Sequence, residues 1–129
     1  MSDAKELKGK SGIKRLINAF SYSKEGFIAA YRSEEAFRQE FWLLVFGAII
    51  AAVLPVTLLQ TVSLIAVLLF LLIVEILNSA IEATIDRIGM EIHPLSKRAK
   101  DMGSCAVLFA CALALIVWAA ILIDCFWLV

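Results

Sequence analysis

The sequence predicts an all-α membrane protein, because its apolar residues are concentrated in long uncharged runs. Of the 129 residues, 62% are apolar and 19% are charged, whereas soluble domains average roughly 45–50% apolar and about 25% charged residues. Residues 41–74 and 102–123 carry no charge. A membrane-spanning helix needs about 20 predominantly apolar residues, so the first run is long enough for two spans and the second for one. This composition excludes a soluble enzyme, a disordered chain and a nucleic-acid-binding protein.

Pro55 divides the first uncharged run, because proline disrupts a helix interior. The piece before it, residues 41–54, is too short to cross a bilayer alone and must recruit the charged turn that precedes it. We therefore predict a single integral-membrane domain over residues 1–129. Its expected parts are an N-terminal arm with a surface helix (1–33), a first span (34–54), a second span (56–86), a cytoplasmic loop (87–97) and a third span (98–126).

The N-terminal arm shows the pattern of an amphipathic helix. Its apolar residues recur at helical spacing, while basic residues take the other faces; the apolar set is Ile13, Leu16, Ile17 and Phe20. This pattern is typical of a helix that lies in the membrane interface. A basic arm without structure is the alternative.

The basic residues predict the orientation of the chain in the membrane. All 12 lie within residues 1–38 or 87–100, and the turn at 54–63 and the C-terminal tail have none. Cytoplasmic loops carry an excess of lysine and arginine. We therefore expect the N-terminus and the loop between the second and third spans to be cytoplasmic, and the C-terminus to lie on the opposite side.

The second span carries charged groups where charge is costly. At about 100° per residue, Glu75, Asn78, Glu82 and Asp86 fall on one narrow stripe. A carboxylate at the centre of a spanning helix costs roughly 2.5–3.5 kcal/mol, and Glu75 is the deepest of the three acids. The stripe predicts a polar site at the cytoplasmic membrane surface that holds cations or moves protons. The alternative is a helix end whose acids merely reach the headgroups.

Polar groups at the ends of the other two spans complete this site. The first span opens with acids and a base, and the third opens with Lys100 and Asp101, followed by Gly103, a small residue suited to close helix packing. Carboxylates combined with a basic group suit a magnesium–phosphate site. His93, the only histidine, is by pattern alone an exposed loop residue rather than a ligand.

Two motifs carry a resemblance to a known family. The stretch Glu75–Arg87, followed by His93–Ser104, closely resembles the bacterial integral-membrane diacylglycerol kinases, and Ala36–Glu40 matches the motif at the start of their first span. The similarity covers roughly residues 12–127. It implies a homotrimeric helical bundle in the bacterial inner membrane, with a periplasmic C-terminus and with active sites shared between subunits. The implied reaction transfers the γ-phosphate of MgATP to the hydroxyl of 1,2-diacylglycerol, which gives phosphatidic acid for phospholipid recycling.

The resemblance also implies roles for individual residues. Glu75 is expected to be the catalytic base on the lipid hydroxyl, with Asn78 helping to orient that region, and Glu34 and Glu82 are expected to hold Mg²⁺. The expected ATP-binding residues are Arg15, Tyr22, Glu34, Glu82, Glu91, Ile92, His93, Lys100 and Asp101. The expected lipid-binding residues are Ala36, Phe37, Arg38, Gln39, Glu40, Glu75, Ser104 and Trp118.

Two other functions remain open at this point. An undecaprenol kinase of the same fold would carry overlapping motifs, although the residues around Arg87 and Asp101 look more like the diacylglycerol branch. A small proton-coupled exporter, from a different class, would use the intramembrane glutamate to bind substrate cations. Such an exporter has no need of Lys100 and Asp101, so ATP binding discriminates between the two classes.

Overall fold

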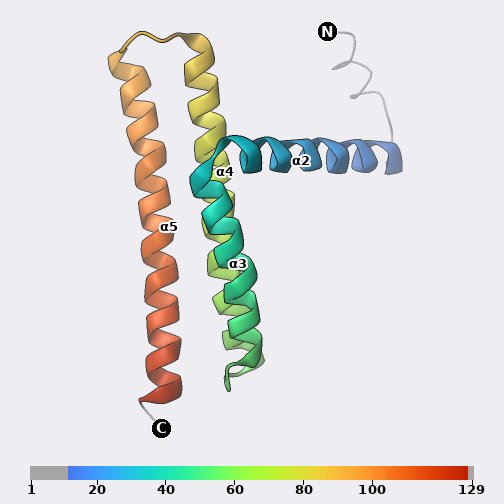
Figure 1. Cartoon of the computed structure of the whole chain (residues 1–129), viewed down its shortest axis with the longest axis vertical. Helices are drawn as coiled ribbons and strands as arrows, with labels where there is room; N and C mark the ends of the chain where they lie inside the picture. The colour runs from blue at the N-terminus through green and yellow to red at the C-terminus, as the bar shows by residue number, and fades with distance from the viewer. Residues whose placement is uncertain (1–11, 128–129) are drawn as a thin grey trace. The chain divides into compact units, whose positions relative to one another are not determined.

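The computed structural model describes residues 12–127 and contains no strand among them. Residues 1–11 of the predicted arm and residues 128–129 lie outside this part of the chain. The described helices are α2 (Ile13–Ser33), α3 (Glu35–Val53), α4 (Leu58–Ile88) and α5 (Pro94–Phe126) (Figure 1). The chain divides into two units at residues 33 and 34, so that α2 forms one unit and α3 to α5 form the other.

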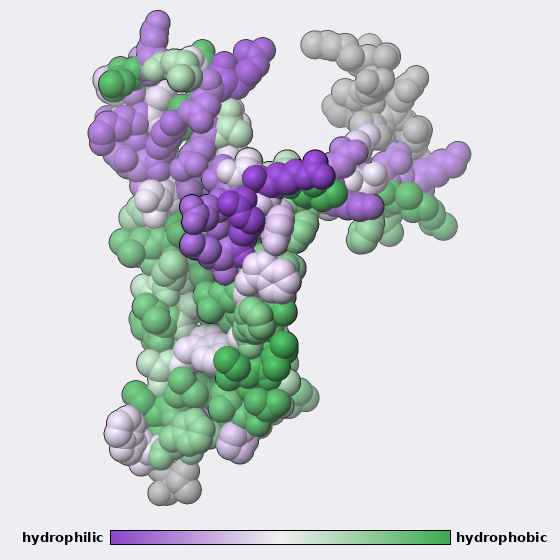
Figure 2. Space-filling view, viewed as in Figure 1, coloured by the Kyte–Doolittle hydropathy of each residue, from purple (hydrophilic) through white to green (hydrophobic). Residues whose placement is uncertain are grey.

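The second unit confirms the three predicted spans. Each of α3, α4 and α5 is long and apolar enough to cross a membrane. Helix α4 packs against both α3 and α5. In Figure 2, hydrophobic residues cover the middle of these helices, while hydrophilic residues gather where α4 and α5 meet their connecting loop. Apolar helices with one polar end are the arrangement that the charge distribution predicted.

Local hydrogen bonds fix the turn between α3 and α4. Helix α3 ends at Val53, before Pro55. Thr57 then caps α4, because its Oγ1 accepts a hydrogen bond from the backbone N–H of Gln60 at 3.2 Å, and its own N–H donates to Gln60 Oε1 at 3.0 Å. This reciprocal capping box satisfies two backbone donors, so α4 starts at Leu58.

Helix α5, which contains the predicted third span, begins at Pro94, ahead of the predicted residue 98. Proline suits the first position of a helix, where its missing N–H is not needed. His93 caps the helix, since its Nδ1 accepts a hydrogen bond from the backbone N–H of Leu95 at 3.1 Å. At the other side, α4 continues through the predicted end of the second span to Ile88. The connection is therefore residues 89–93, shorter than the predicted 87–97.

Helix α2 is continuous over Ile13–Ser33. This finding contradicts the alternative, an arm without structure, for residues 13–33. The apolar side chains of Ile13, Leu16, Ile17 and Phe20 are all exposed. Their location in a membrane interface stays a prediction.

Small residues let the three spanning helices approach one another closely. Buried positions include Gly47 and Ala51 on α3 and Gly103, Ala110 and Ala114 on α5. Such residues are typical of helix interfaces in membranes, where packing must replace the hydrophobic effect as the force between helices. The facing side of α4 supplies the large buried side chains Leu64, Leu68 and Leu71.

Candidate active site

The polar stripe of α4 is most buried at the end that the sequence places within the span. Glu75 is buried, with 5% of its surface exposed, and Asn78 and Ser79 are also buried at 9%. Glu82 is half-buried and Asp86 is exposed. Burial therefore decreases steadily along the stripe, and Glu75 is its most enclosed carboxylate.

Carboxylates of α3 gather near Glu75. The charges of Glu34 and Glu82 both act on Glu75, and the charge of Glu75 acts on Glu40. Glu34 is the residue that precedes α3, and its side chain does not cap that helix. Glu40 has a buried Oε2 atom with no hydrogen-bond partner. The start of α3 and the middle of α4 thus assemble an acidic cluster from two helices.

Asn78 connects this acidic cluster to α5. Its Nδ2 donates a long hydrogen bond to Glu82 Oε1 at 3.5 Å. Its carboxamide also packs directly against Gly103 of α5, where any side chain would occupy the same space. The sequence predicted close packing at Gly103 but not this partner, because the register between two helices is not encoded in the periodicity of either one.

An ion pair ties α4 to α5 beyond the acidic cluster. Lys100 Nζ lies 2.8 Å from Asp86 Oδ1. One helical turn away from it on α5, Lys97 Nζ lies 2.7 Å from Asp101 Oδ2. These pairs place two lysines at the polar end of the bundle, next to the loop at 89–93.

A cleft of about 240 Å³ lies between the end of α4, this loop and the start of α5. It brings together five of the residues that the sequence predicted to bind ATP, namely Glu91, Ile92, His93, Lys100 and Asp101. The structure adds four residues to its lining that sequence reasoning did not assign to it, namely Ile85, Met90, Ser96 and Lys97. His93, an unremarkable loop residue by pattern alone, both lines the cleft and caps α5.

Two predicted ATP-binding residues lie outside this unit. Arg15 and Tyr22 are exposed residues of α2, and α2 forms a unit of its own. Their assignment to the nucleotide site stays a prediction.

The predicted lipid-binding residues occupy two levels of the bundle. Residues 36–40 form the first turns of α3, where Phe37 is buried and Gln39 is exposed. Ser104 is exposed at the polar end of α5. Trp118 lies roughly 22 Å further along α5 than Gly103, at 1.5 Å per residue, and its Nε1–H donates a hydrogen bond to the Leu64 carbonyl of α4 at 3.1 Å. The structure therefore separates Trp118 from the acidic cluster.

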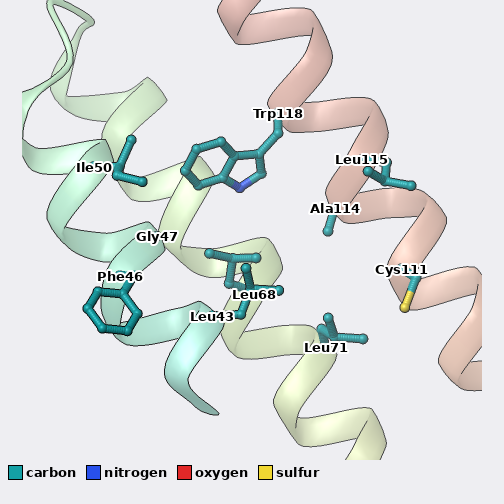
Figure 3. Close-up of a pocket in the computed structure, with 10 residues that line it drawn as sticks. All are labelled: Leu43, Phe46, Gly47, Ile50, Leu68, Leu71, Cys111, Ala114, Leu115 and Trp118. Carbon is teal, nitrogen blue, oxygen red and sulfur yellow. The ribbon is translucent and has the colours of Figure 1, made fainter. Parts of the chain in front are cut away.

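An apolar cavity of about 470 Å³ fills the space between these two levels. Side chains of α3, α4 and α5 line it, and the Trp118 ring reaches into it from α5 (Figure 3). Leu71, one turn before Glu75 on α4, also lines this cavity. The cavity thus begins close to the acidic cluster and extends along the spans to Trp118.

The carboxylates of the acidic cluster have the chemistry that Mg²⁺ binds, but they do not form a complete metal site by themselves. No group of three or more His, Cys, Asp or Glu side chains within residues 12–127 could hold a metal ion by itself. Mg²⁺ is usually bound by one or two carboxylates together with waters and substrate phosphates. Glu34 and Glu82 are two carboxylates whose charges both act on Glu75, and their binding of one Mg²⁺ ion stays a prediction.

Three apolar spans with a buried carboxylate and a lysine-containing cleft at one end define a polytopic membrane protein with a polar site at its surface. Residues 21–122 match the model of the prokaryotic diacylglycerol kinase family. The diacylglycerol kinase of Pseudomonas aeruginosa is 52% identical over 118 residues, which are 92% of this chain and 96% of that protein. That of Escherichia coli K12 is 50% identical over 112 residues, 87% of this chain and 92% of that protein. That of Haemophilus influenzae is 40% identical over 112 residues, 87% of this chain and 95% of that protein. The chain belongs to the prokaryotic diacylglycerol kinase family.

Proposed function

We propose that this protein is an ATP-dependent diacylglycerol kinase, which transfers the γ-phosphate of ATP to the hydroxyl of 1,2-diacylglycerol and releases phosphatidic acid. Family membership across most of the chain identifies the reaction and its lipid acceptor. The observation that carries the site assignment is the burial of Glu75, within the span, on the stripe that leads to the Lys100–Asp86 ion pair. A carboxylate at that depth can meet a hydroxyl at the membrane surface, while the cleft faces a water-soluble nucleotide.

Glu75 acts as the general base in this proposal. A lipid hydroxyl is a weak nucleophile, and a positioned carboxylate that accepts its proton raises its reactivity. The hydroxyl oxygen forms a bond to the γ-phosphorus, the bond from that phosphorus to the bridging oxygen of ADP breaks, and Glu75 takes the hydroxyl proton. Asn78 keeps Glu82 in place through its hydrogen bond and is itself held against α5 by Gly103.

Phosphoryl transfer depends mainly on positioning and on neutralising negative charge. Lys100 lines the cleft and supplies a cation for the phosphates. Glu34 and Glu82 would hold a Mg²⁺ ion, which would neutralise charge on the same phosphates. Arg15 and Tyr22 of α2 would add contacts to the nucleotide.

The lipid would lie along the apolar cavity, with its hydroxyl near Glu75. The cavity starts beside the acidic cluster at Leu71 and ends near Trp118, and its lining is entirely apolar. An acyl chain fits that chemistry, whereas a charged group does not. Residues 36–40 and Ser104, at the polar end of the spans, would contact the glycerol portion.

The protein would sit in the bacterial inner membrane as a homotrimer, with the N-terminus and the loop at 89–93 in the cytoplasm and the C-terminus in the periplasm. The distribution of basic residues supports this orientation. Large apolar side chains remain exposed on all three spans, for example Phe46, Phe70 and Phe109, and both lipid and further copies can cover them. Crosslinking in native membranes tests the assembly. Detection of the monomer alone would contradict the trimer.

Phosphorylation by the purified protein in lipid–detergent mixtures tests the proposed function. MgATP is supplied with diacylglycerol or undecaprenol in parallel reactions. Rapid formation of phosphatidic acid, with little undecaprenyl phosphate, is the expected result. Preference for undecaprenol would change the assigned lipid acceptor but not the assigned base or nucleotide site. No transfer to either lipid by a folded sample would overturn the kinase assignment.

A further inference from the structure

Lys97 is a cation of the nucleotide cleft that the predicted site does not include. It lines the cleft together with His93, Lys100 and Asp101. Its side chain is 70% exposed, and its Nζ is 2.7 Å from Asp101 Oδ2, a residue four positions later on the same helix. Asp101 therefore holds the ammonium group of Lys97 at the wall of the cleft.

Lys97 balances the charges of the cleft. Among the residues that line it, Lys97 and Lys100 are basic, and Glu91 and Asp101 are acidic. Without Lys97, the acids would outnumber the bases and would repel an anionic MgATP complex. With both lysines present, each phosphate-binding cation has a carboxylate that positions it, namely Asp101 for Lys97 and Asp86 for Lys100.

The position of Lys97 on α5 also favours phosphate binding. Helix α5 begins at Pro94, and the Lys97 N–H closes its first turn on the His93 carbonyl at 3.0 Å. The first turn of a helix carries partial positive charge and attracts phosphate groups. Lys97 therefore adds a full charge at the end of α5 where an anion is already favoured.

We propose that Lys97 is a second phosphate-binding residue of this nucleotide site, positioned by Asp101 and exchanging that ion pair for phosphate oxygens when MgATP binds. This proposal deepens the proposed kinase function and rests on it. The exchange is favourable because an exposed ion pair contributes little stability of its own, whereas a bond from an ammonium group to phosphate is charge-assisted.

Lys97 also borders a second, adjoining hollow on α5, together with Arg98, Met102 and Cys105. Arg98 lines only that second hollow. It therefore provides a matched control, since it is the adjacent basic residue on the same helix. A role for Lys97 in binding an anionic lipid headgroup there would alter lipid kinetics instead of nucleotide kinetics.

The experiment compares Lys97→Gln, Lys97→Arg and Arg98→Gln with the wild type. The KM for MgATP and the KM for diacylglycerol are measured separately, and trinitrophenyl-ATP binding is titrated by fluorescence without lipid acceptor. We expect Lys97→Gln to raise both the KM for MgATP and the Kd of the probe about fivefold, as for loss of one exposed charge-assisted contact. The KM for diacylglycerol should stay unchanged, Lys97→Arg should retain most of the affinity, and Arg98→Gln should match the wild type.

The proposal is overturned if Lys97→Gln and Arg98→Gln change nucleotide affinity equally, or if Lys97→Gln changes only the KM for diacylglycerol. Loss of nucleotide affinity in Lys97→Arg as well as Lys97→Gln would also contradict it, because a retained charge should retain binding. The probe titration separates this proposal from the kinase assignment. A wild type that binds the probe but phosphorylates no lipid would refute the kinase reaction alone, and a wild type that binds no probe would refute both.

Discussion

Asn78 on α4 packs against Gly103 on α5 so closely that a methyl group at position 103 would overlap the carboxamide oxygen of Asn78. The same carboxamide donates to Glu82 through its Nδ2 atom. The glycine therefore does more than bring two helices together. It leaves the space in which a polar side chain, buried within the span, holds a carboxylate of the acidic cluster.

Replacing Gly103 with alanine should displace Asn78 and impair catalysis. The added methyl group forces the carboxamide away from α5 and from its contact with Glu82, and overpacking of this kind costs about 1–3 kcal/mol. We expect kcat to fall about tenfold or more, the lower end of what partners of metal ligands contribute, with a modest loss of thermal stability. Steady-state kinetics and a thermal unfolding scan of the purified protein measure both effects.

Gly26→Ala is the matched control for that change. A Cβ atom at position 26, inside α2, meets nothing within 4 Å. Alanine is favoured over glycine in a helix interior by about 0.5–1 kcal/mol, so this variant should be as active as the wild type and no less stable. A Gly103→Ala protein with the kinetics of Gly26→Ala would show that Asn78 does not depend on its packing against α5.

The sequence allowed the three long apolar helices and the alignment of the acids on one of them to be predicted, because both follow from patterns within single helices. Uncharged runs define the spans, and helical periodicity aligns the acids on one stripe, of which Glu75 is the most buried member, with 5% of its surface exposed. The early start of α5 was also present in the sequence as Pro94, a residue typical of a first helical position. The composition of the cleft was not accessible in this way. Met90 and Lys97 join it because of how residues 89–93 connect two helices, and no periodicity describes such a connection.

Glu82→Gln should weaken the use of Mg²⁺ with little effect on the fold. The glutamine Oε1 can still accept the hydrogen bond from Asn78, so the change removes the negative charge and keeps the shape. Activity should be abolished by EDTA and restored by Mg²⁺. The Mg²⁺ concentration for half-maximal activity should rise at least about tenfold in the variant, because loss of even an outer-shell partner of a metal ligand costs about that much. Titration of Mg²⁺ at fixed ATP gives this value.

Asp124→Asn serves as the control for Glu82→Gln. Asp124 accepts a hydrogen bond from Gln60 at 3.3 Å near the C-terminal end of α5, far along the bundle from Glu82. Loss of the negative charge of Asp124 should leave the dependence of activity on Mg²⁺ unaltered. An identical Mg²⁺ requirement in wild type, Asp124→Asn and Glu82→Gln would contradict the proposal that Glu82 binds Mg²⁺.

Trp118→Phe should lower stability without altering nucleotide binding. The substitution keeps an aromatic ring at the wall of the apolar cavity but removes the hydrogen bond from Nε1 to the Leu64 carbonyl. Hydrogen bonds between membrane helices contribute about 0.6 kcal/mol on average. Unfolding in SDS should show a decrease of that size in the free energy of unfolding, and the KM for MgATP should be unchanged. A large rise in that KM would mean that Trp118 acts at the nucleotide site and not only in the span.

The role of Glu75 as the base is the central claim, and phosphate transfer by Glu75→Gln tests it most directly. Wild type, Glu75→Gln and Asp124→Asn are assayed with MgATP and diacylglycerol, and trinitrophenyl-ATP binding and oligomer size are measured on the same samples. We predict that Glu75→Gln loses about 10²–10⁴-fold in kcat, the usual contribution of a general base. It should still bind the nucleotide and keep the assembly of the wild type, while Asp124→Asn remains fully active. A folded Glu75→Gln protein that retains more than a tenth of the wild-type rate would contradict this account.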